Sequence, residues 1–126
     1  MSISNRKVVI VGAGHVGSHV GYALISQSLA DEIVYIDSDR AKAVAQALDL
    51  TDATNYLPVR TKVTAGDYSD AKDAQIMIIS AGPLPTGNQT RMDTLGQTIA
   101  ILKDVTKSIK ESGFDGIIVN ISNPAD

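Results

Sequence analysis

The chain has 126 residues, of which 44% are hydrophobic and 20% charged, values typical of one globular domain and unlike those of a disordered chain. Its net charge of −3, without any basic tract, argues against nucleic acid or an anionic membrane as a partner, and no apolar run approaches the roughly 20 residues of a membrane span. The absence of cysteine excludes disulfides and thiolate metal ligands, fits a reducing, cytoplasmic compartment, and leaves no metal site that we would expect.

Strands and helices alternate along the chain. Runs rich in β-branched residues predict strands over residues 7–11, 32–36, 61–65, 75–80 and 116–120. Helical periodicity predicts helices over residues 15–29, 39–54 and 91–111, with a single helical turn near residues 68–73. Alternation of this kind predicts an α/β fold with a doubly wound parallel sheet and helices on both faces.

The periodicity also predicts which helix faces are buried. Val16, Val20 and Leu24 recur every four residues and are expected to pack the first helix onto the sheet. In the third helix the same role is expected for Leu95, Ile99, Leu102 and Ile109. Asp39 suits the cap that begins the second helix, and Gly113 suits a left-handed cap that ends the third.

A glycine motif, G-x-G-x-x-G, occupies residues 12–17 between the first strand and the first helix, which is the context that dinucleotide binding requires. Gly12 allows the tight turn out of the strand. Gly14 lets a pyrophosphate approach the backbone, and Gly17 lets helix and strand pack closely. The helix N-terminus offers free N–H groups to the phosphates.

Asp37 ends the second predicted strand, 20 residues after Gly17, where an acidic residue binds the hydroxyls of the adenine ribose. A carboxylate there repels a 2′-phosphate, so NAD is favoured over NADP. Glycine turn and acid together predict a Rossmann domain over residues 1–126 that binds NAD. The two histidines, His15 and His19, lie in the turn and on the following helix, and neither is well placed as a catalytic acid.

Three later segments carry a family resemblance. Ala81-Gly82, residues 90–95 (TRMDTL) and residues 121–126 (ISNPAD) resemble the L-lactate and malate dehydrogenase family. The resemblance covers essentially the whole chain. It implies that the loop after the fourth strand is a lid whose arginine, Arg91, polarises the substrate carbonyl, and that Asn123 contacts the substrate oxygen and the nicotinamide side.

The resemblance also implies an NAD groove. Together with the glycine motif and Asp37, its expected cofactor-binding residues are Gly12, Ala13, Gly14, His15, Val16, Gly17, Asp37, Lys42, Tyr68, Ala81, Gly82, Pro83, Ile121, Ser122 and Asn123.

Substrate choice in this family depends on the lid residue six positions before the arginine, where lactate enzymes carry glutamine and malate enzymes arginine. This chain has Pro85 there, preceded by Leu84, and Gln89 stands too close to Arg91 to replace it. The resemblance therefore implies a 2-oxo or 2-hydroxy acid with a bulkier apolar side chain, as in the L-2-hydroxyisocaproate dehydrogenases. Lactate and malate remain alternative substrates.

The family's catalytic histidine, its partner aspartate and a carboxylate-binding arginine normally follow the Asn-Pro pair. No histidine follows His19. We therefore expect the NAD-binding half of a longer enzyme, with five of six strands, without the C-terminal catalytic domain and inactive alone. The family implies a homodimer or homotetramer. A non-catalytic dinucleotide-binding or sensing module is the alternative, but such a module has no need of Arg91.

Overall fold

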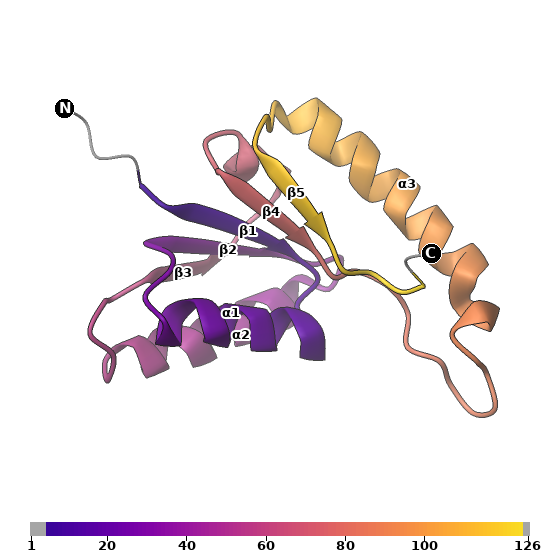
Figure 1. The fold of residues 1–126 in the computed structure, drawn as a ribbon, viewed down its shortest axis with the longest axis horizontal. Coiled ribbons are helices and arrows are strands. Elements are labelled where there is room, and N and C mark those ends of the chain that lie inside the picture. Colours follow the sequence, from indigo (N-terminus) through magenta and orange to yellow (C-terminus); the bar gives the residue numbers. More distant parts are fainter. Residues whose placement is uncertain (1–4, 125–126) are drawn as a thin grey trace.

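A computed structural model describes residues 5–124, and its centre is a parallel sheet of five strands in the order β3-β2-β1-β4-β5 (Figure 1). Every neighbouring pair of strands is parallel. The predicted doubly wound sheet is thus confirmed. The strands are β1 (Lys7–Val11), β2 (Glu32–Ile36), β3 (Lys62–Ala65), β4 (Ile76–Ile79) and β5 (Ile117–Asn120).

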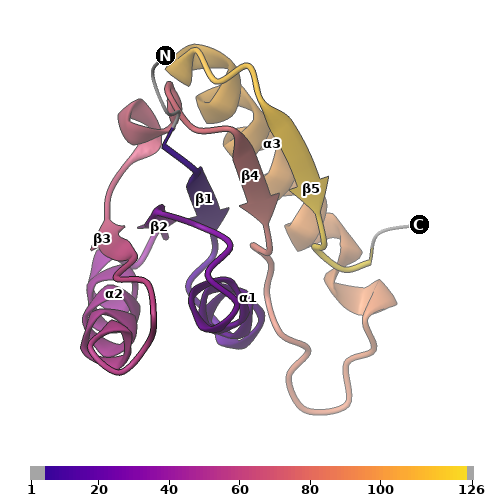
Figure 2. The same ribbon diagram turned by 60° about the vertical axis from the view of Figure 1, so that its left-hand side comes forward.

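Helices cover both faces of this sheet. Figures 1 and 2 show α1 (His15–Ser26) and α2 (Arg40–Thr54) on one face and α3 (Leu95–Ser112) on the other. Alternate strand residues feed two separate cores, as the period of two requires. The short 3-10 helices η1 (Tyr68–Ala71) and η2 (Met92–Thr94) complete the elements. No helix within residues 5–124 is long and apolar enough to cross a membrane.

The strands lie within one residue of their predicted bounds, whereas two helices differ more. The first helix ends at Ser26, three residues early. The third, expected from residue 91, begins at Leu95 after the turn of η2, because Thr90 and Asp93 hydrogen-bond to each other and hold the chain in a tighter turn. Asp39 caps α2 through the backbone N–H of Lys42, and Gly113 ends α3 at φ 80°, both as predicted.

The predicted buried face of α1 is correct only in part. Val16 is 54% exposed, and the buried residues of α1 are Gly17, Gly21 and Ile25. A Cβ on Gly17 would overlap the carbonyl oxygen of Gly12, so the helix lies too close to the strand for a larger side chain. Val20 and Leu24, the other two predicted residues, are partly buried and pack against the core. The glycine turn, rather than the apolar stripe, therefore sets the rotation of α1.

The buried face of α3 differs in part from expectation. The buried residues of α3 are Thr98, Val105 and Ile109, while Ile99 is 43% exposed. Thr98 is buried because its hydroxyl donates to the backbone of the segment after β5. All residues of β5 are exposed, and this strand forms one edge of the sheet.

Candidate functional site

The carboxyl ends of β1, β2 and β4 border a cleft of about 540 Å³. The glycine turn, the end of β2 and the loop that follows β4 line it from below, and one face of α3 lines it from above. In parallel α/β sheets, ligands bind at this edge, where the strand order reverses. The volume lies in the range of small-molecule sites, about 300–1,000 Å³.

The glycine turn shapes the floor of the cleft. Gly12 has φ 107°, a left-handed conformation that side chains rarely adopt, and its N–H donates to the carbonyl of Ile36 at 2.8 Å. No side chain caps the N-terminus of α1, whose N-cap is Gly14. A Cβ on Gly14 would meet nothing within 4 Å, so open space adjoins the uncapped helix end. This is the arrangement that binds a phosphate group.

Two backbone hydrogen bonds hold the side chain of Asp37 at the end of β2. Its Oδ2 accepts a hydrogen bond from the backbone N–H of Ala13 at 2.8 Å, and its Oδ1 accepts one from the N–H of Asp39 at 2.8 Å. Each oxygen keeps a lone pair for a further donor. The carboxylate is thus oriented to receive the two hydroxyls of a ribose, and its charge opposes a 2′-phosphate. The residues present therefore fit NAD.

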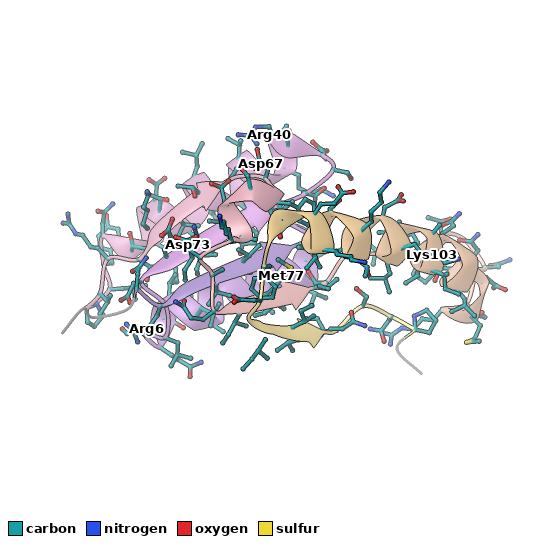
Figure 3. All side chains as sticks on the ribbon, turned by 90° about the horizontal axis from the view of Figure 1, so that it is seen from above. Arg6, Arg40, Asp67, Asp73, Met77 and Lys103 are labelled. Atoms are coloured by element: carbon teal, nitrogen blue, oxygen red, sulfur yellow. The ribbon has the colours of Figure 1, made fainter. Side chains whose placement is uncertain are left out.

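Tyr68 of η1 lies beside this carboxylate. Burial, reinforced by the negative charge of Asp37, raises the pKa of Tyr68, so its hydroxyl stays protonated and can donate. Asp67 caps η1, and hydrogen bonds from Ser69, with the nearby charge of Arg40, hold the pKa of Asp67 below its usual range (Figure 3). The cap fixes Tyr68 at the wall of the cleft.

The segment after β5 lies against the loop after β4. The hydroxyl of Thr98 donates to the carbonyl of Asn123 at 3.2 Å, and a Cβ on Gly82 would lie 3.9 Å from the same oxygen. Ser122 is buried, and its hydroxyl donates to the carbonyl of Ile79 at 3.4 Å. Ala125 and Asp126, the end of the resembling motif, lie outside the described residues.

Arg91 stands apart from the cleft. It lies on the loop that Figure 2 shows extending from β4 to α3, and its side chain is exposed. Its backbone is nevertheless fixed, because the Thr94 hydroxyl donates to the Arg91 carbonyl at 2.7 Å, and Thr90 donates its N–H to Asp93 Oδ2 at 2.6 Å. The bonds from Thr90 also lower the pKa of Asp93.

The cleft gathers part of the expected site. It is lined by Gly12, Gly14, Asp37, Lys42, Tyr68, Ala81, Gly82 and Pro83. Outside its lining lie Ala13, His15, Val16, Gly17, Pro85, Arg91, Ile121, Ser122 and Asn123. His15 and Val16 border a shallow apolar hollow on α1 instead.

The sequence analysis missed one wall of the cleft. Ile101, Asp104, Val105 and Ser108 of α3 line it. Their spacing of three and four residues places them on one helix face, a signal that was readable, although the sequence analysis assigned only Leu95, Ile99, Leu102 and Ile109 to a face of this helix.

Comparisons with known proteins agree with this geometry. A family model described as the NAD binding domain of lactate/malate dehydrogenase matches residues 6–126. L-lactate dehydrogenase 3 of Bacillus cereus is 44% identical over the whole chain, and L-lactate dehydrogenase 1 of Bifidobacterium longum is 42% identical. The ligand-bound crystal structure of the minor L-lactate dehydrogenase of Enterococcus mundtii superposes with a TM-score of 0.92 at 41% identity over 98% of this chain. The chain spans 40% of the length of each of these relatives.

Proposed function

The chain belongs to the lactate/malate dehydrogenase family, as its NAD-binding domain, and from that premise we propose that it is the cofactor-binding part of an NAD-dependent L-2-hydroxy acid dehydrogenase. The observation that carries the proposal is the single cleft in which the uncapped turn at Gly14, the carboxylate of Asp37 and the loop at Gly82 meet. Bound there, NAD supplies hydride exchange with the substrate.

In this proposal the chain's residues bind and orient. The N–H groups at Gly14 and the start of α1 bind the pyrophosphate, and Asp37 binds the adenine ribose. Arg91 reaches the substrate when the loop closes, and its guanidinium polarises the carbonyl oxygen in a water-poor site. Asn123, held beside Gly82, contacts the same oxygen.

For the substrate we propose a 2-oxo acid with an apolar side chain, of the hydroxyisocaproate type. Leu84 is 73% exposed and precedes Pro85 on the loop. The side chain of Gln89 is engaged within the loop, where its Oε1 accepts from the N–H of Thr86 at 3.1 Å. The position six residues before Arg91, occupied by Pro85, therefore offers the substrate neither a side-chain amide nor a cation. The names of the relatives favour lactate as the second candidate.

The remaining parts of the proposal concern the whole protein. The proton donor is a histidine that residues 1–126 do not supply, so this chain alone binds NADH without turnover. A homodimer or homotetramer in the cytoplasm is supported by the family and by the cysteine-free sequence. A non-catalytic sensing module is the alternative, which the fixed backbone around Arg91 disfavours.

The deciding experiment follows NADH oxidation with 2-oxoisocaproate, pyruvate and oxaloacetate, using the longest gene product that contains this chain and, in parallel, the 126 residues alone. We expect a preference for 2-oxoisocaproate from the longer protein, and NADH binding without turnover from the chain alone. Arg91→Gln should abolish most turnover in the longer protein but leave NADH binding unchanged.

Each other outcome has a definite meaning. A preference for pyruvate would support the proposed dehydrogenase activity but reject the proposal that Pro85 selects a substrate with an apolar side chain. Turnover by the 126 residues alone would reject the proposal that the proton donor is a histidine outside them. NADH binding without turnover of any of the three acids by the longer protein would favour the sensing module.

A further inference from the structure

One face of helix α3 lines the cleft, and none of the motifs that carry the family resemblance includes its residues. Ile101, Asp104, Val105 and Ser108 line the cleft from successive turns of the helix. Val105 is buried and Ile101 half-buried, whereas Asp104 is exposed. This face therefore consists of an apolar wall with a carboxylate at its rim.

The surroundings of this wall indicate which part of the cofactor meets it. Asp37, proposed to bind the adenine ribose, directly follows β2, and Ile36 and Tyr68 also line the cleft. Ile101 and Val105 line the same cleft and belong with Ile36 and Tyr68 to one apolar cluster. A flat base attached to that ribose would lie against these apolar side chains, where it buries a face and leaves its polar edge toward the rim.

The charge of Asp104 requires an explanation in such a cleft. A second carboxylate in the cleft that Asp37 also lines repels an anionic dinucleotide. Within residues 5–124 the Asp104 carboxylate forms no ion pair, and no hydrogen bond engages it. Its acceptors are therefore free, and a hydrogen-bond donor on the ligand would offset the repulsion. The adenine ring carries one such donor on its rim, the 6-amino group.

We propose that Asp104 accepts a hydrogen bond from the 6-amino group of the adenine and makes the site selective for adenine over a 6-oxo purine. The inference rests on the proposed NAD-binding function of the cleft. A 6-oxo base carries a carbonyl oxygen at that position and its ring N–H at the neighbouring one, so it cannot donate the same hydrogen bond. Asp104 is thus a specificity-determining residue at the end of the cofactor farthest from the chemistry.

The test compares the affinity of the 126-residue chain for NADH and for reduced nicotinamide hypoxanthine dinucleotide, by nicotinamide fluorescence. A hydrogen bond to an exposed charged group predicts that the unchanged chain binds NADH about fivefold more tightly. Asp104→Ala should abolish this preference by weakening NADH binding alone. Asp49→Ala, which removes an exposed carboxylate from α2 instead, should keep it.

Two results would overturn the proposal: equal affinity of the unchanged chain for both dinucleotides, or equal weakening of both by Asp104→Ala. In either case the cleft would still bind NADH, so the proposed function would stand. Failure of the unchanged chain to bind either dinucleotide would reject NAD binding by the cleft, and the role of Asp104 with it.

Discussion

Tyr35 shows how a single side chain fixes the cofactor-binding turn. It is fully buried in β2, and its hydroxyl donates to the carbonyl of Gly17 in the first turn of α1, at 2.9 Å. Burial raises the pKa of Tyr35 far above its usual range, so the hydroxyl remains a donor. Gly21 makes room for it, since a Cβ there would overlap the hydroxyl. The tyrosine and the glycine thus form a complementary pair beneath the turn.

Gly21→Ala tests this pair. The added methyl group forces Tyr35 or α1 to move, and we expect a loss of about 1–3 kcal/mol in the free energy of unfolding, the usual cost of overpacking a core. Tyr35→Phe alone removes one hydrogen bond and should cost about 1 kcal/mol. Because Tyr35→Phe also removes the overlapped oxygen, the double variant should lose less than the sum of the single losses. Urea unfolding of the four proteins measures all three values.

Gly14→Ala is the matched control, since it adds the same methyl group in a position where nothing lies within 4 Å. It should leave the free energy of unfolding nearly unchanged while it weakens NADH binding, because the methyl group enters the space proposed for the pyrophosphate. Additive losses from Gly21→Ala and Tyr35→Phe would show that the two residues act independently.

At the level of elements, strands were more predictable than helix faces. Each strand is a short β-branched run bounded by glycine or polar residues, which marks its ends locally. The faces of α1 and α3 depend instead on contacts distant in sequence: Gly17 against Ser80, and Thr98 against Asn123. In the candidate site, the glycine motif and the spacing of the acid after it located Gly14 and Asp37. The face of α3 that lines the cleft matches no sequence motif, because its apolar residues pack in the core as well as lining the cleft.

The exposed edge formed by β5 leads to a second prediction. Its apolar residues Ile117, Ile118 and Val119 are 66%, 49% and 43% exposed, and its outer backbone groups are unpaired within the described residues. Such an edge favours pairing with another strand. We expect the 126-residue chain to associate as its concentration rises, and Ile118→Lys to reduce the association. Sedimentation velocity over a range of concentrations measures it.

Leu48→Lys is the comparison variant. Leu48 is 62% exposed on α2, the helix on the opposite edge of the molecule from β5 (Figure 2). If Leu48→Lys reduces association and Ile118→Lys does not, then α2 and not the strand edge is the surface through which copies of the chain meet.

On the scale of the whole molecule, the two edges of the sheet have different tasks. The carboxyl edge carries the cleft, whereas side-chain bonds tie the strands together at the amino edge. Arg6, before β1, pairs with Asp31, before β2, and the buried Lys7 pairs with Asp73, before β4 (Figure 3). These bonds hold the amino ends of three neighbouring strands in register, so the turns at the other edge need not be tied to one another by ion pairs.

The Arg6–Asp31 pair predicts how stability depends on pH. Side-chain and backbone hydrogen bonds from Arg6 lower the pKa of Asp31 to about 2. A carboxyl whose pKa is lower in the folded state stabilises the protein above its unfolded pKa, about 4, and that contribution is lost as the pH falls toward the folded value. Arg6→Gln should therefore lower the free energy of unfolding at pH 6, by an amount that shrinks as the pH falls below about 4.

Urea unfolding between neutral and acidic pH measures the difference. The control is Arg60→Gln, which removes an arginine outside any ion pair in residues 5–124. A loss that stays constant across this range would mean that Arg6 stabilises the amino edge through its bond to the Ser28 carbonyl, which does not titrate, rather than through Asp31.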